Sequence, residues 1–319
     1  MEMPHLTIGN QTARLPIIQG GMAVRISMAP LASAVAEAGG IGLIAGSGLD
    51  VDELREEIRA ARAATNGVIG VNIMVAVRKF RDLVQAALAE GIDLVVAGAG
   101  FSRDVFSWCA EADVPMVPIV GSERVAKLSQ RFGASAVIVE GVEAGGHLGT
   151  DEPLKQLLPR ILDSVTIPVI GAGGIADGAD IKEILDMGAA GVQMGSRFAA
   201  TRESSASDAF KQLYVDAGDD DIVIVKSPVG LPGRAIRSTF TRRLERGDYP
   251  RIEKCIVCLK DCGKDYCIID KLVKAQQGDM EDGLIFAGTT AARVHDIPAV
   301  SELMDRLVTQ WKAATEGAN

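Results

Sequence analysis

Short runs of β-branched and aliphatic residues that end in glycine recur along the chain. Eight such runs end near residues 20, 44, 73, 97, 120, 140, 171 and 194. Segments with apolar residues at every third or fourth position fill the gaps, as in MAPLASAVAEAG and ADIKEILDMGA. The spacing of roughly 20 to 31 residues is that of one strand–loop–helix–loop unit. The pattern therefore predicts eight repeated β/α units.

Eight units of near-equal length close naturally into an α/β fold of the (β/α)8 type, a TIM barrel. An open doubly wound sheet is the alternative, although it usually contains fewer units and a long crossover. The chain has 48% apolar but only 4% aromatic residues. This composition suits parallel strands of Ala, Val, Ile and Leu that helices cover on both faces. We predict that residues 1–215 form the barrel.

The regular pattern stops after Phe198. The stretch KSPVGLPGRAIRSTFTRRLERGDYPRIEK is rich in Pro, Gly and Arg, which disfavours long regular elements. We therefore predict an irregular C-terminal insertion over residues 216–290, which also carries a cysteine cluster. In residues 291–319, the segment VSELMDRLVTQWKAA has an apolar stripe at helical spacing. It predicts a closing helix that packs on the barrel.

Charge and hydropathy narrow the class of partner. The formal net charge of -9 argues against nucleic-acid binding, which needs Lys and Arg at the phosphates. No apolar run approaches the roughly 20 residues that a membrane helix needs, and MEMPHLTIGNQTARLP lacks the order of a signal peptide. We expect a cytoplasmic protein with a small-molecule substrate and with neither a nucleic-acid nor a membrane partner. A homodimer is left open.

Unusual residues follow the predicted strands. In a TIM barrel the active site lies at the carboxyl ends of the strands. GAGGIADGADI and QMGSRF predict turns after two neighbouring strands. Their backbone N–H groups and the Ser196 hydroxyl could together bind a phosphate. The alternative is that the glycines only form tight turns. The candidate cofactor-binding residues are Gly20, Gly21, Met22, Asn72, Glu140, Gly145, Gly146, Gly173, Gly174, Gln193, Met194, Gly195 and Ser196.

Five ordered motifs carry a family resemblance: PIIQGGM, VNIMV, EGVEAGGHLG, PVIGAGGI and VQMGSRF. Across roughly residues 12–200 the chain resembles the FMN-dependent nitronate monooxygenases, formerly 2-nitropropane dioxygenases, and the related flavin-dependent enoyl-ACP reductases; GLIFAGTTAARVHDI is a weaker likeness. The resemblance implies FMN at the mouth of the barrel. It places the Gly20–Met22 backbone against the isoalloxazine and Asn72 and Glu140 at polar flavin edges. Around the ribityl phosphate it places Gly145, Gly173, Gly174, Gly195 and Ser196.

One of the three histidines, His147, lies between glycine pairs in EGVEAGGHLG. On the loop after the sixth strand it would lie over the barrel mouth. An imidazole with a pKa near 6.5 can take or give a proton at neutral pH, so His147 is a candidate acid or base. A helix cap is the alternative. In the resembling family the matching histidine is the proposed catalytic residue. We expect His5 to be solvated.

The resemblance leaves three functions open. The first is a nitronate monooxygenase that uses O2, and the second is an NAD(P)H-dependent enoyl-ACP or enoyl-CoA reductase. The third is a non-catalytic flavin-binding protein. PIVGSERV lacks the lysine that some nitronate monooxygenases have after the fifth strand, which puts the first function in question. The basic run GRAIRSTFTRRLERG either holds a phosphate of CoA or of a carrier protein, or is a solvated surface.

Four cysteines, Cys255, Cys258, Cys262 and Cys267, follow a C-x2-C-x3-C-x4-C spacing. Four thiolates can bind a [4Fe-4S] cluster or a tetrahedral Zn2+, so we predict a metal centre. The alternative is a set of reduced or locally disulfide-bonded cysteines. Cys109, in DVFSWCAEA, is expected to be a packed thiol.

Overall fold

Eight parallel strands form a closed barrel in the computed structural model, which describes residues 2–317. The barrel closes because β11 pairs with β3, with Met194 opposite Gln19. This closure confirms the predicted TIM barrel and excludes an open doubly wound sheet. The barrel strands are β3 (Ile17–Gln19), β4 (Ile41–Ala45), β5 (Val68–Met74), β6 (Leu94–Gly98), β7 (Met116–Val120), β8 (Val137–Glu140), β10 (Val169–Ala172) and β11 (Gly191–Met194).

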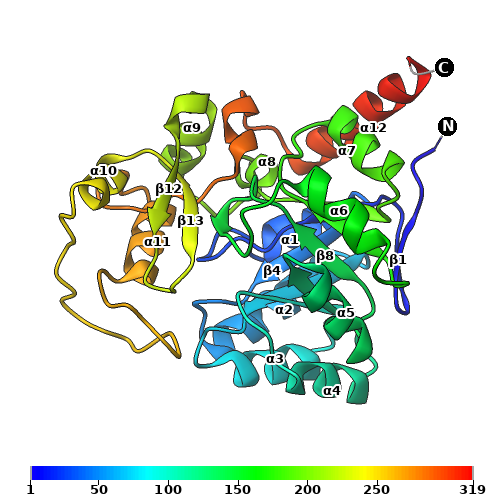
Figure 1. The fold of residues 1–319 in the computed structure, drawn as a ribbon, viewed down its shortest axis with the longest axis horizontal. Helices are drawn as coiled ribbons and strands as arrows, with labels where there is room; N and C mark the ends of the chain where they lie inside the picture. Colours follow the sequence, from blue (N-terminus) through cyan, green and yellow to red (C-terminus); the bar gives the residue numbers. More distant parts are fainter. Residues whose placement is uncertain (1, 318–319) are drawn as a thin grey trace.

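Helices follow the strands and surround the barrel (Figure 1). All five residues of β4 are buried, which explains why its sequence is an unbroken apolar run. The helices are α1 (Ala29–Glu37), α2 (Val51–Ala64), α3 (Phe80–Ala89), α4 (Asp104–Glu111), α5 (Glu123–Arg131), α6 (Leu154–Leu162), α7 (Gly178–Asp186) and the short α8 (Ser196–Ala199).

A hairpin that the sequence did not predict packs on the amino-terminal end of the barrel. Its strands are β1 (Leu6–Ile8) and β2 (Gln11–Ala13). The turn glycine Gly9 has a φ of +59°, and a Cβ there would meet Pro115 and Ser135, which precede β7 and β8. Leu6 and Ile8 belong to the same buried cluster as the residues inside the barrel. This end of the barrel is therefore closed.

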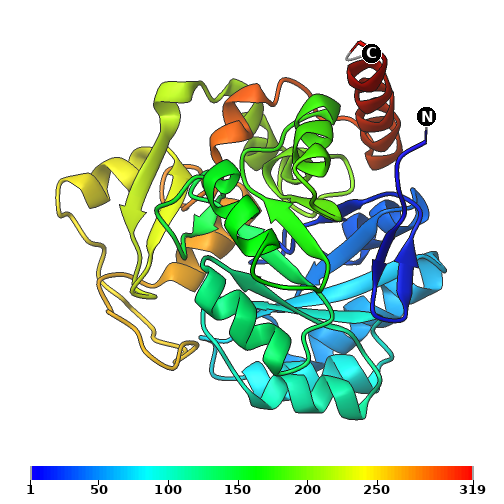
Figure 2. The same ribbon diagram turned by 45° about the vertical axis from the view of Figure 1, so that its right-hand side comes forward.

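The region after the barrel is more regular than predicted. It contains α9 (Asp208–Asp216), β12 (Ile222–Lys226), β13 (Pro232–Ile236), α10 (Thr239–Glu245) and α11 (Ile268–Gln277). The prediction of an irregular insertion was wrong for these elements, because IVIVK alternates as a strand does and the strand β13 accommodates Pro232 and Gly233. These elements form a lobe at one side of the barrel (Figure 1 and Figure 2).

The predicted closing helix is α12 (Val300–Glu316). It packs against α7 and α1, and Gln310 Oε1 accepts a hydrogen bond of 3.1 Å from the Gly178 backbone N–H. A Cβ at Gly178 would lie 2.3 Å from the Leu307 carbonyl oxygen, so glycine permits this close approach. Among residues 2–317, no helix has the length and apolar character needed to cross a membrane.

Candidate active site

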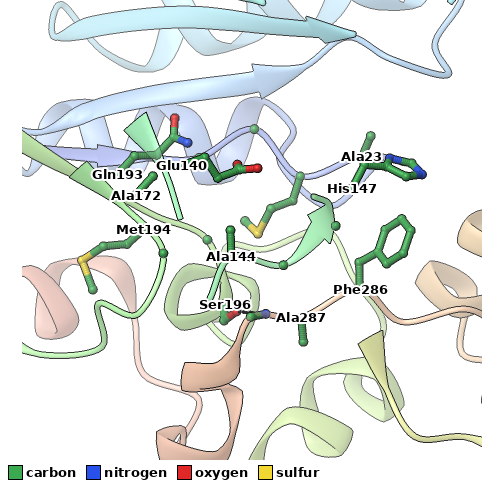
Figure 3. Close-up of a pocket in the computed structure, with 18 of the residues that line it drawn as sticks. Ala23, Glu140, Ala144, His147, Ala172, Gln193, Met194, Ser196, Phe286 and Ala287 are labelled. Atoms are coloured by element: carbon green, nitrogen blue, oxygen red, sulfur yellow. Dashed lines mark hydrogen bonds between the residues drawn. The ribbon is translucent and has the colours of Figure 1, made fainter. Parts of the chain in front are cut away.

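A cavity opens at the carboxyl ends of the barrel strands. The turns after the strands form most of its wall, and residues of the C-terminal lobe complete it. Figure 3 shows His147 beside Phe286 at one side of the cavity and Glu140 near Gln193 at the other. All residues that the sequence assigned to the cofactor or to catalysis line this cavity: Gly20, Gly21, Met22, Asn72, Glu140, Gly145, Gly146, His147, Gly173, Gly174, Gln193, Met194, Gly195 and Ser196.

The turn after β3 packs tightly against its neighbours. A Cβ at Gly21 would lie 2.4 Å from the Asn72 Cβ on β5, so no larger residue fits without a shift. The Gly20 N–H donates to the Met194 carbonyl at 2.9 Å, and the Met22 N–H donates to Ser27 Oγ at 2.9 Å. These contacts fix the turn as one wall of the cavity.

The turn after β10 has a left-handed backbone, with φ of +101° at Gly173 and +74° at Gly174. Gly195 and Ser196, at the start of α8, line the cavity from the next turn. The two turns therefore adjoin, as the phosphate prediction required.

The amino terminus of α7, which follows the turn after β10, is capped by Asp177. The Asp177 carboxylate accepts from the backbone N–H groups of Ala179 and Asp180, at 2.9 and 3.0 Å. Arg293 forms ion pairs with Asp177 and Asp180 at 2.6 and 2.9 Å. Because these two N–H groups are satisfied within the protein, the glycine turns are the better candidates for the phosphate site.

The segment 284–288 forms part of the cavity that the sequence did not identify. The Gly288 N–H donates to Ser196 Oγ at 2.8 Å, and a Cβ at Gly145 would lie 2.5 Å from the Gly288 nitrogen. The Tyr214 hydroxyl donates to the Phe286 carbonyl. The only signal in the sequence was the weak similarity of GLIFAGTT to the same family, and this similarity did not assign a role to Phe286.

Gln193 and Glu140 have polar atoms on the cavity wall without a protein partner in the described part of the chain. Within residues 2–317, the buried Gln193 Oε1 accepts no hydrogen bond, and the Glu140 carboxyl makes none. Burial raises the pKa of Glu140 to about 8, so this carboxyl is protonated at neutral pH. Buried polar groups are normally paired, so both groups are available to a ligand.

We predict that Glu140 makes stability depend on pH. An unfolded glutamate has a pKa of about 4.3, whereas burial raises the pKa of Glu140 in the folded protein to about 8. Between these values the folded state holds the extra proton, so the stabilisation is complete below about pH 4.3 and is lost as the pH rises through about 8. The melting temperature of Glu140→Gln minus that of wild type should therefore increase as the pH is raised from about 5 to about 9. A difference that is constant across this range would contradict the assignment.

His147 lies on the short strand β9 (Gly146–His147), which pairs with β13, where Gly233 is opposite His147. Its Nε2 lies 2.8 Å from Ser227 Oγ, and its ring meets the Phe286 ring edge-on, with centroids 5.0 Å apart. Burial lowers the pKa of His147 to about 4. The pKa of His147 thus lies below the unperturbed value of 6.5, and the ring is neutral at physiological pH.

The alternative role of His147 as a helix cap is excluded. The next helix, α6, begins at Leu154, and the Leu154 N–H donates to Glu143 Oε2 at 3.0 Å. The other two histidines, His5 and His295, are exposed. His147 is thus the one histidine of residues 2–317 on the cavity wall.

The predicted metal centre is not formed. Nowhere in residues 2–317 do three or more His, Cys, Asp or Glu side chains lie so that they could hold a metal ion. All four cysteines of the cluster are free thiols: Cys255 and Cys262 are exposed, and Cys258 and Cys267 are half-buried.

The backbone explains why these thiols do not converge. The Arg78 N–H donates to the Cys258 carbonyl, and the Lys260 N–H donates to the Ala76 carbonyl, both at 2.9 Å. These bonds tie the segment to the loop after β5, while Cys267 immediately precedes α11. The prediction from spacing was therefore wrong, and the alternative of reduced cysteines holds. Cys109 is buried, and burial raises the pKa of its thiol to about 12, which confirms a packed thiol.

Three arginines of the basic run form hydrogen bonds or ion pairs within the protein. Arg234 donates to the Val142 carbonyl at 2.7 and 3.1 Å, which holds the loop after β8. Arg237 pairs with Glu245 at 3.0 Å, and Arg243 pairs with Asp248 at 2.8 Å. These three arginines have structural partners.

Comparisons with known proteins agree with this fold. The chain is 31% identical to a Mycobacterium tuberculosis protein named (3aS,4S,5R,7aS)-5-hydroxy-7a-methyl-1-oxo-octahydro-1H-indene-4-carboxyl-CoA dehydrogenase, over 92% of each chain. It is 28% identical to a probable nitronate monooxygenase of Staphylococcus aureus, over 74% of this chain and 79% of that protein. The structure of FabK from Thermotoga maritima superposes with a TM-score of 0.85 at 33% identity, over 95% of this chain and 94% of FabK.

A model of one protein family matches almost the whole chain. Residues 6–310 match the model described as nitronate monooxygenase. This range includes both the barrel and the C-terminal lobe, so the match extends beyond the five motifs of the sequence. The chain therefore belongs to the nitronate monooxygenase family of oxidoreductases.

Proposed function

We propose that the protein is an FMN-dependent oxidoreductase that reduces or oxidises the acyl group of a thioester. The observation that carries this proposal is the apolar wall that the C-terminal lobe adds to the cavity. Phe286 is half-buried on this wall, and the buried residues Phe210, Tyr214, Leu272 and Leu284 back it; an apolar wall of this kind suits a hydrocarbon chain or ring. A small alkyl nitronate would leave much of this wall without contact.

The similarity to a protein named as a carboxyl-CoA dehydrogenase supports a thioester substrate, because that relative aligns over 92% of each chain. The resemblance to flavin-dependent enoyl-ACP reductases points the same way. With NAD(P)H as reductant, the reaction would proceed in the direction of an enoyl reductase.

The residues present fit an FMN. Gln193 Oε1 and the protonated Glu140 carboxyl are unpaired polar groups on the cavity wall and could bond the polar edges of the flavin. Gly173, Gly174 and the start of α8 leave room for the ribityl phosphate because a Cβ is absent at both glycines. When bound, FMN would supply the hydride-transfer chemistry, while the protein orients the substrate and excludes water.

We predict that the bound flavin is FMN and not FAD. The turns after β10 and β11 offer one phosphate cradle, and the sequence shows no second site for an adenosine. Acid release of the flavin followed by chromatography should yield FMN alone. Recovery of FAD would contradict the proposed arrangement.

The second candidate is oxidation of a nitronate with O2. The family description and the relative in Staphylococcus aureus favour it. The absence of a lysine in PIVGSERV is the feature that weighs against it.

Steady-state assays on one preparation separate the two candidates. NADH or NADPH oxidation is measured without oxygen in the presence of an enoyl-CoA such as crotonyl-CoA, and O2 uptake is measured with an alkyl nitronate. We expect NAD(P)H oxidation that depends on the thioester. O2 uptake that depends on the nitronate, without turnover of the thioester, would overturn the proposal in favour of the second candidate.

A further inference from the structure

The side chain of His147 makes one hydrogen bond within residues 2–317, and its partner is Ser227. Ser227 follows β12 directly and is only 3% exposed. Its Oγ lies 2.8 Å from His147 Nε2 and accepts a hydrogen bond of 3.3 Å from the Val229 N–H. The Gly230 N–H donates to the Ser227 carbonyl at 3.0 Å, which fixes the turn. The hydroxyl is therefore held against the imidazole by the C-terminal lobe.

We propose that Ser227 is a positioning residue that holds His147 in the Nδ1–H tautomer, so that the ring offers an N–H donor to the ligand. A serine hydroxyl has one proton to donate and two lone pairs. The Val229 N–H occupies one lone pair, and the proton still needs an acceptor. Within residues 2–317, His147 Nε2 is the one acceptor paired with this hydroxyl.

The opposite tautomer would satisfy these groups less well. If Nε2 carried the proton, the Ser227 oxygen would accept from two donors, and its own buried O–H would have no partner. A buried donor without a partner is costly. Donation from Ser227 to Nε2 satisfies every group and leaves the proton of the neutral ring on Nδ1.

The surroundings keep the ring neutral and oriented. Burial holds the pKa of His147 near 4, so at neutral pH the ring carries a single N–H. The edge-on contact with Phe286, at an interplanar angle of 71°, and the pairing of β9 with β13 restrict its orientation. Nδ1 makes no hydrogen bond to the protein within residues 2–317. The N–H is thus left for a ligand in the cavity that His147 lines.

This tautomer assigns His147 the role of a hydrogen-bond donor and not that of a base. A donor aimed at a carbonyl oxygen stabilises the negative charge that develops there when the neighbouring carbons react. That this oxygen belongs to a thioester rests on the proposed function, whereas the tautomer itself rests only on the contacts of Ser227.

The tautomer can be measured directly. The flavin-loaded protein is labelled with 15N-histidine, and the signals of His147 are assigned by their loss in His147→Ala. At pH 7 we expect an Nδ1 of the protonated type and an Nε2 of the unprotonated type. The reverse pattern would overturn the proposal. A protein with Nδ1–H that does not turn over thioesters would contradict the proposed function alone.

Two variants test the role of the hydroxyl. Ser227→Ala should lose the fixed tautomer and lower kcat by roughly 10- to 100-fold, the usual effect of removing a residue that orients a functional group. Ser227→Thr retains a hydroxyl and should keep both the Nδ1–H signal and most of kcat. If Ser227→Ala lost activity while His147 remained in the Nδ1–H form, the serine would have only a structural role and the proposal would fail.

Discussion

His147→Ala is expected to lower kcat/KM by about 10²-fold or more while FMN remains bound, the scale found when a positioned hydrogen-bond donor is lost. The side chain is on the cavity wall, and its removal leaves the β9–β13 pairing intact because that pairing uses only backbone groups. The measurement compares kcat/KM for the thioester in variant and wild type, each with its flavin content determined.

His295→Ala is the matched control, because His295 is exposed and does not line the cavity. It should retain wild-type kcat/KM. Unchanged turnover in His147→Ala would remove His147 from the reaction, whereas loss of flavin from that variant would show that the ring serves the cofactor.

Gly174→Val is expected to expel the flavin. Gly174 has a φ of +74°, and a β-branched residue adopts this conformation only with strain. A side chain there would also point toward Glu143, whose Cβ would lie 3.5 Å from the new Cβ. Because 3.5 Å is an ordinary van der Waals contact, it is the strain at the positive φ that we expect to shift the turn and, with it, one side of the phosphate cradle. Flavin absorbance per mole of purified protein measures the loss.

Gly91→Val is the matched control, because it introduces the same backbone strain at a position outside the cavity. Gly91 has a similar φ of +73°, a Cβ there would meet no heavy atom within 4 Å, and the residue does not line the cavity. This variant should lose stability but retain its flavin. If both variants kept a full complement of flavin at normal affinity, the assignment of the phosphate to the Gly173–Gly174 turn would be contradicted.

The barrel was predictable because its strands have a local signature. Parallel strands that are buried on both faces have unbroken apolar runs, and the turns after them need glycine, as at Gly173 and Gly174. The positions of the cavity residues followed from the strand ends. The hairpin β1–β2 was missed because its strands have three residues each, too few for a periodic pattern.

The lobe and its contacts were not predictable from local patterns. Ser227 and His147 lie 80 positions apart, and only the pairing of β13 with β9 brings them together. The lowered pKa of His147 likewise depends on burial by residues distant in the sequence. The spacing of Cys255–Cys267 suited a metal site, but hydrogen bonds from Arg78 and to Ala76 determine where the backbone of that segment runs.

The central claim is that the flavin of this protein exchanges hydride with an acyl thioester, and one anaerobic measurement tests it most directly. The enzyme is reduced with one equivalent of dithionite and mixed with crotonyl-CoA, while flavin absorbance is recorded and the acyl-CoA product is analysed. We predict that oxidised flavin returns as one equivalent of saturated acyl-CoA forms. The claim would be contradicted if the flavin stayed reduced after crotonyl-CoA was added while the oxidised enzyme consumed alkyl nitronates.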